Sequence, residues 1–297
     1  MPTTPSHRPA VTGLRTNPHA AEAAVFVDRW VRRTGLIQSF SAQRRFRRAG
    51  CAEFAARVMP DAECGRLKRG TAWLVWFFIF HDRSEEYGQS PPFADALLDF
   101  LPPDTGRTPP ARTALERGLA DAWRMVAPVM SPRWRERFLG HFGEFTGSWP
   151  AGSAARPLFD LIEYTGGFEV PPEVRELPSF RAVDAAAALR CPGQCELSPE
   201  LLASRRKAFR RALSTLHRDL APRRLPAEAV SAASAYTEAL TLWMGGPPGG
   251  AGELPPAGGR LILTEDITGT PVDLLRPRRP AGWHEGVGKV SGTLRTK

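Results

Sequence analysis

The residues best suited to chemistry lie in one short stretch, the run H-D-R-S-E-E at positions 81–86. Carboxylates three and four residues apart project from one face of a helix, and Asp82, Glu85 and Glu86 have this spacing. Carboxylate oxygens suit the hard Mg²⁺ ion, whereas the imidazole of His81 suits it poorly. His81 and Asp82 are also a candidate catalytic acid–base pair, because histidine titrates near neutral pH. The alternative is an ordinary charged helix end.

The aromatic run that precedes this stretch includes Trp73, Phe77, Phe78 and Phe80. Together with His81 they are the predicted lining of an apolar ligand pocket. Aromatic walls exclude water and stabilise a cation through cation–π contact. The alternative is that all four aromatic residues pack between helices.

The elements that must position these residues are amphipathic helices with recognisable ends. Asn17 followed by proline predicts the start of the first helix, and Gly35 predicts its end. Further helices are expected over residues 42–58, 62–80, 115–128, 132–145, 157–164, 199–220 and 226–244. No β-rich stretch interrupts them. The sequence therefore predicts an all-α bundle with a central cavity over residues 17–245.

The two ends of the chain differ in composition from this bundle. Residues 1–16 lack an apolar core and are expected to be disordered. The 53 residues from Gly245 contain 12 Gly and 7 Pro, a content typical of disordered segments. Residues 246–297 are therefore expected to form a Gly/Pro-rich flexible tail, although two short apolar runs within it leave a small hairpin or a docking segment open.

Composition excludes several classes of protein. The net charge of +9 comes largely from arginine pairs, but no nucleic-acid motif accompanies them, so solvated helix faces are expected and no nucleic-acid partner. The longest apolar run, residues 72–80, is half of what a membrane span needs. Cys191 and Cys195 lack a second pair at zinc-finger spacing. A cytoplasmic protein is expected.

Several blocks occur together in a recognisable order. They are Asn17-Pro18-His19-Ala20, the runs at 28–36, 45–47 and 54–62, the aromatic run 73–80, and the runs at 127–138 and 159–171. Together they resemble the bacterial class I terpene synthases over residues 17–245. The resemblance implies an all-α fold whose members ionise a polyprenyl diphosphate with the help of Mg²⁺, arginines and hydrogen-bond donors.

The same resemblance implies that much of the family's diphosphate site is replaced here. His81 stands where the family has its first aspartate, and Asp82, Glu85 and Glu86 remain as the candidate metal ligands. The family's second metal motif aligns near Cys195-Glu196, followed by Pro199 and Ala203 at its ligand steps. Pro150 stands near the place of the diphosphate-sensing arginine, for which Arg156 is a candidate substitute. Residues 245–248, Gly-Gly-Pro-Pro, stand where an Arg-Tyr pair is expected.

Three functional hypotheses follow. The first is a terpene-synthase homologue that lacks the standard trinuclear Mg²⁺ site and binds an apolar isoprenoid-like ligand or a protein partner, with a homodimer as one option. The second is a non-canonical terpenoid-modifying enzyme that uses the same aromatic pocket with His81 and Asp82. The third is a standard sesquiterpene cyclase with divergent motifs. Mg²⁺ is expected as a cofactor only where the family's activity is retained.

Overall fold

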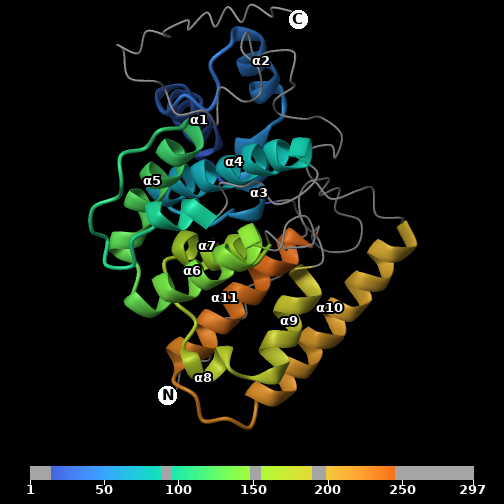
Figure 1. Ribbon diagram of the computed structural model, residues 1–297. Coiled ribbons are helices and arrows are strands. Elements are labelled where there is room, and N and C mark those ends of the chain that lie inside the picture. Colours follow the sequence, from blue (N-terminus) through green and yellow to red (C-terminus); the bar gives the residue numbers. More distant parts are fainter. Residues whose placement is uncertain (1–14, 88–94, 148–154, 189–198, 245–297) are drawn as a thin grey trace, which may run out of the picture.

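The computed structural model describes residues 15–87, 95–147, 155–188 and 199–244, and every regular element among them is helical (Figure 1). The elements are α1 Ala20–Thr34, α2 Phe40–Arg48, α3 Cys51–Val58, α4 Cys64–Tyr87, η1 Asp95–Phe100, α5 Ala114–Val126, η2 Ala127–Val129, α6 Pro132–Gly147, α7 Ala155–Gly166, α8 Pro172–Arg175, α9 Pro178–Ala188, α10 Pro199–Leu220 and α11 Ala227–Trp243. The all-α prediction is confirmed. The predicted N-terminal segment is described only from Arg15, and the predicted tail lies outside the described residues.

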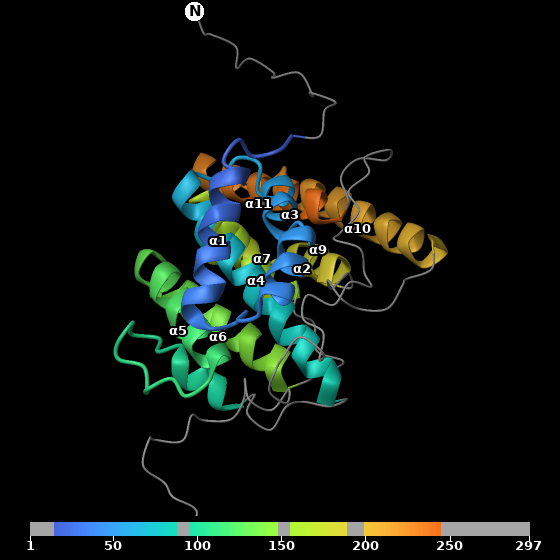
Figure 2. The same cartoon turned by 90° about the horizontal axis from the view of Figure 1, so that it is seen from above.

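Helix α4 is the central element of the bundle. It packs against α1, α3, α5 and α7, and Figure 2 shows it inside the ring that these helices make with α6. Its residues 72–77 are buried on every side, which is the pattern expected of a helix enclosed by others. This helix carries the stretch 81–86, so the bundle positions that stretch through α4.

The helix boundaries follow the local signals in part. Gly35 and Gly167 adopt left-handed conformations after α1 and α7, as helix-ending glycines do. The single helix expected over residues 42–58 was wrong. Gly50 has a left-handed φ of 65° and separates α2 from α3, because only glycine adopts that conformation without strain.

The first helix begins differently from the prediction. Its N-cap is His19, without a side-chain capping bond, and Asn17 is instead used for a tertiary contact. The buried Asn17 amide donates hydrogen bonds to the carbonyls of Met59 and Ala62, at 2.9 and 2.7 Å. Asn17 therefore ties the start of α1 to the turn between α3 and α4.

Helices α9, α10 and α11 form one flank of the bundle. Helices α9 and α10 pack closely along each other, and α11 packs on α7, α9 and α3 (Figure 1). Among the described residues, no helix combines the length and the apolar character that crossing a membrane requires.

Candidate functional site

Four helix ends meet at the candidate site. Trp73 contacts Phe138 at 5.0 Å between ring centroids, and Phe80 contacts Phe145 at 5.2 Å. Helices α4 and α6 therefore run in the same direction and end at the same side of the bundle. Helix α7 runs the other way and begins there, since Arg156 near its start pairs with Glu144 near the end of α6 at 2.9 Å.

Helix α11 ends at the same place. Trp243 lies 5.5 Å from Phe54 of α3 and 6.3 Å from Phe159 of α7, measured between ring centroids. We call this end of the bundle the rim. It is formed by the carboxyl ends of α4, α6 and α11 and the amino end of α7.

The predicted acid–base and metal residues lie at the rim on α4. His81 is buried, with 5% of its surface exposed, and Asp82 is half-buried beside it. Asp82 is close enough to Cys51 of α3 to affect its titration. Burial chiefly raises the pKa of the Cys51 thiol to about 12, and the charges of Glu53 and Asp82 add to the rise. The thiol is therefore protonated at neutral pH.

The other predicted ligands, Glu85 and Glu86, lie on the last turn of α4. Their side chains are outside the described part of the chain, as are Cys195 and Glu196. Helical spacing still places both residues on the face of Asp82. Their role as metal ligands stays a prediction. A metal there would be held by these three carboxylates from α4.

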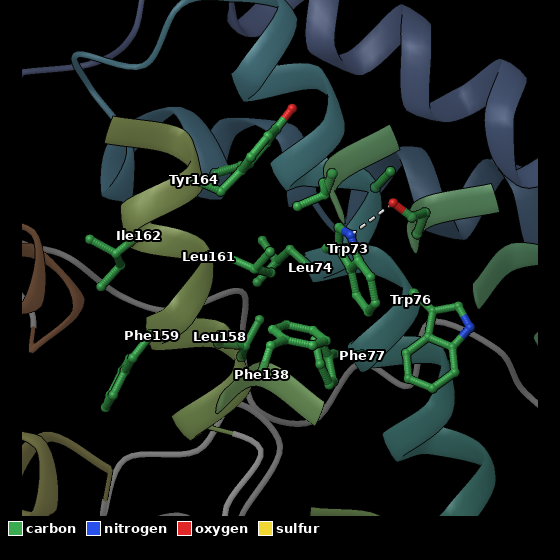
Figure 3. Close-up of a cluster of buried hydrophobic side chains, with 14 of the residues drawn as sticks. Trp73, Leu74, Trp76, Phe77, Phe138, Leu158, Phe159, Leu161, Ile162 and Tyr164 are labelled. Atoms are coloured by element: carbon green, nitrogen blue, oxygen red, sulfur yellow. Dashed lines mark hydrogen bonds between the residues drawn. The ribbon is translucent and has the colours of Figure 1, made fainter. Parts of the chain in front are cut away.

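The predicted pocket aromatics divide between two faces of α4. Trp73, Phe77 and Phe80 face α6 and belong to a cluster of tilted and edge-on rings. Figure 3 shows Trp73 and Phe77 of α4 beside Phe138 of α6. The indole of Trp73 donates a 3.1 Å hydrogen bond to the carbonyl of Ala122, which fixes the ring in the core. Phe78 faces the other way and lies 6.3 Å from Phe54 of α3.

A second aromatic set at the rim was not predicted from the sequence. It consists of Phe78, Phe54, Trp243 and Phe159, in contact from ring to ring. These residues come from four helices, and only their packing brings them together. The available sequence signal was that Trp243 is an aromatic residue at the end of the last predicted helix.

The indole of Trp243 is buried, and its Nε1 has no hydrogen-bond partner among the residues that the structure describes. The side chain as a whole is 6% exposed. Buried polar groups are nearly always hydrogen-bonded in folded proteins. An unsatisfied donor beside the second aromatic set is therefore suited to an oxygen atom of a bound molecule.

A buried charge network holds the helices that carry the rim. On α7, Asp160 and Glu163 are 1% and 0% exposed. Arg137 of α6 donates to Asp160 at 2.8 Å and also pairs with Glu163. His141 contacts Asp160 at 2.6 Å, and Arg175 of α8 contacts Glu163 at 2.7 Å.

The pKa values of the two carboxylates are shifted in opposite directions. Burial pushes the pKa of Asp160 upward, but the hydrogen bond from His141 and the charges of His141, Arg137 and Arg175 outweigh it, so the pKa is lowered. For Glu163 burial prevails over the two arginines and the pKa is raised. Both residues lie inside a block that resembles the family, yet their structural role was missed. The available signal was two acidic residues in an otherwise apolar helix.

Comparison with known proteins agrees with this architecture. Residues 72–151, which include the stretch 81–86, match the family described as terpene synthase family 2, C-terminal metal binding. Pentalenene synthase of Streptomyces arenae is 32% identical over 188 residues, covering 54% of this chain and 55% of that protein. The chain thus aligns with about half the length of the curated relatives it matches.

Solved structures agree on the fold over a longer span. Hedycaryol synthase in complex with HEPES has a TM-score of 0.64 at 23% identity, over 80% of this chain and 95% of that one. Hedycaryol synthase in complex with nerolidol has a TM-score of 0.62 at 20% identity, over 81% and 98%. The fold is that of the class I terpene synthases. In sequence, the chain is similar to bacterial terpene synthases over about half of their length.

Proposed function

We propose that this chain binds an apolar isoprenoid-like ligand at the rim and does not ionise a polyprenyl diphosphate with a standard set of three Mg²⁺ ions. The observation that carries the proposal is His81. A buried imidazole stands on α4 where the family has its first aspartate. An imidazole nitrogen is a poor replacement for a carboxylate oxygen on Mg²⁺.

The surroundings of His81 favour an apolar ligand. Phe78, Phe54 and Trp243 supply aromatic surface, and the unpaired indole N–H of Trp243 supplies one polar contact. Binding sites for small molecules commonly combine apolar walls with a few placed polar groups. A neutral isoprenoid alcohol such as nerolidol, which hedycaryol synthase holds in one solved structure, has this composition.

A second candidate function is diphosphate ionisation with a divergent metal site. It is favoured by the family match, because that match is described as metal binding and spans the acidic stretch. Asp82, Glu85 and Glu86 would then hold Mg²⁺, which when bound neutralises charge on a departing diphosphate. His81 paired with Asp82 could also move a proton to or from a neutral terpenoid, which is the third option.

Two measurements on the full chain separate these functions. The first is incubation with geranyl, farnesyl and geranylgeranyl diphosphates and Mg²⁺, followed by gas chromatography of the products. The second is titration with nerolidol in the absence of Mg²⁺, followed by tryptophan fluorescence. We expect saturable quenching and no terpene product. A hydrocarbon or a cyclic alcohol from farnesyl diphosphate would overturn the proposal.

The variant His81→Asp supplies the matched control. It restores one carboxylate on α4, but a metal cluster needs ligands from a facing helix as well. We therefore expect no product from this variant. Products from His81→Asp but not from the natural chain would show that this one residue alone had removed the activity and that the rest of the site can still ionise a diphosphate.

A further inference from the structure

A separate group of potential metal ligands lies at the other end of α4. His19, Glu22 and Cys64 each offer one ligand atom, and these atoms lie within 4.8 Å of one another. Cys64 begins α4 and His81 lies 17 residues later, so the group is about 25 Å from the rim along the helix. We propose that His19, Glu22 and Cys64 form a binding site for Zn²⁺, with water as the fourth ligand.

The donor set selects the metal. Thiolate and imidazole are preferred by Zn²⁺ and poorly suited to Mg²⁺, and a carboxylate commonly completes a zinc site. Around a tetrahedral Zn²⁺ ion, neighbouring nitrogen and oxygen ligands are roughly 3.3 Å apart, given bonds of about 2.0–2.1 Å. The Nδ1 atom of His19 lies 3.2 Å from Oε1 of Glu22. A bound ion would replace the proton that these two atoms share.

The ligands are held in place before any metal binds. His19 and Glu22 occupy the N-cap and first turn of α1, and Cys64 begins α4. The buried Asn17 side chain fixes the start of α1 relative to the start of α4. Its amide donates to the carbonyls of Met59 and Ala62, and its Oδ1 accepts from the backbone N–H of His19 at 3.0 Å. Such preorganisation reduces the ordering cost of binding.

The local charge is also compatible with a metal bound through anionic ligands. The amino ends of α1 and α4 both lie at this site, and the amino end of a helix favours negative charge. Besides His19, the ammonium group of Lys68 acts on the Glu22 carboxylate. Its side chain is half-buried and long, so its ammonium can move towards solvent when a cation takes the carboxylate.

The test is calorimetric titration of the reduced, metal-free full chain with Zn²⁺, together with the absorption spectrum of its Co²⁺ form. Because Cys191 and Cys195 lie outside the described residues and are also thiols, the titration is repeated in a Cys191→Ser/Cys195→Ser background. We expect one ion per chain in both, a thiolate-to-cobalt charge-transfer band, and a melting temperature that rises with Zn²⁺.

Single variants assign the ligands. Cys64→Ser should remove the charge-transfer band and weaken binding by about a hundredfold, and Glu22→Gln should weaken it by about tenfold or more. Cys51→Ala should leave both unchanged, because that thiol is buried elsewhere. Thermal melting without metal shows whether each variant folds. If Cys64→Ser does not fold, Glu22→Gln still tests the proposal, because Glu22 is exposed. Binding that survives Cys64→Ser or Glu22→Gln undiminished, or that disappears with Cys191 and Cys195, would overturn the proposal.

Discussion

Arg137 of α6 donates a 2.8 Å hydrogen bond from its Nε to the carboxylate of Asp160 on α7, which is 1% exposed. The same carboxylate contacts His141. Removing one partner of a buried ion pair leaves an uncompensated charge, which is strongly destabilising. This pair therefore anchors two of the helices that form the rim.

The first prediction concerns this anchor. Asp160→Ala should lower the free energy of unfolding by about 3–5 kcal/mol, since it removes the buried carboxylate that both Arg137 and His141 contact. Asp160→Asn keeps an acceptor of the same shape and should cost less. Urea denaturation of both variants measures the difference. Equal stability of Asp160→Ala and the natural chain would show that the pair contributes nothing.

The second prediction concerns pH. The hydroxyl of Tyr236 donates a 2.8 Å hydrogen bond to Asp184, and burial raises the pKa of Asp184 to about 6. The unfolded chain loses this proton near pH 4. Between about pH 4 and 6 the folded state thus binds more protons, so the contribution of Asp184 to stability falls as pH rises and levels off above 6.

Asp184→Asn should remove this dependence. A shift of this size corresponds to at most about 3 kcal/mol, and because the side chain is 23% exposed we expect about 1–2 kcal/mol. The measurement is the urea midpoint of the natural chain and the variant from pH 4 to 7. The difference between the two chains isolates Asp184 from the other carboxyl groups. Parallel curves across that range would contradict the assignment.

The third prediction concerns the break between α2 and α3. Gly50→Ala should destabilise the fold by about 1–2 kcal/mol, since its left-handed backbone is unfavourable for alanine. The space around its Cβ is not the cause, because the nearest atom would lie 3.5 Å away. Gly140→Ala is the matched control. It lies inside α6 with no atom within 4 Å, and it should stabilise by about 0.5–1 kcal/mol. Thermal melts compare both variants, and a stabilising Gly50→Ala would disprove the backbone explanation.

The fourth prediction concerns the indole of Trp243. Trp243→Phe keeps the aromatic contact and removes the unsatisfied N–H, so stability should change little. Affinity for nerolidol should fall roughly 2- to 10-fold, the value of one hydrogen bond, whereas affinity for the hydrocarbon farnesene should not change. Fluorescence quenching of the remaining tryptophans measures both. Equal losses for alcohol and hydrocarbon would mean that the ring, not its N–H, contacts the ligand.

The fifth prediction concerns residues 246–297. Their Gly and Pro content leaves too little apolar surface to offset the entropy of ordering. A chain ending at residue 245 should therefore melt within about 5 °C of the full chain, which is about 1–2 kcal/mol. A larger drop would show that this segment docks on the bundle.

The sequence alone determined the helical fold and the helix that leads into the stretch 81–86. Apolar residues three and four apart, with Gly35 and Gly167 after their helices, were enough to predict most boundaries, because these signals are local. The blocks that resemble the family were enough to predict its fold. The stretch 81–86 was expected at the end of the helix predicted over residues 62–80, and α4 continues through it to Tyr87.

Only the tertiary structure decided which side chains meet. Phe54, Phe78 and Trp243 lie on three helices, and their contacts depend on how those helices pack. The amphipathic period shows which face of a helix is buried but not which helix covers it. The same holds for His19 beside Cys64, which are brought together by Asn17 and the turn before α4. Contacts between distant segments arise from packing between helices, and the hydrophobic period of a single helix does not determine how it packs against the others.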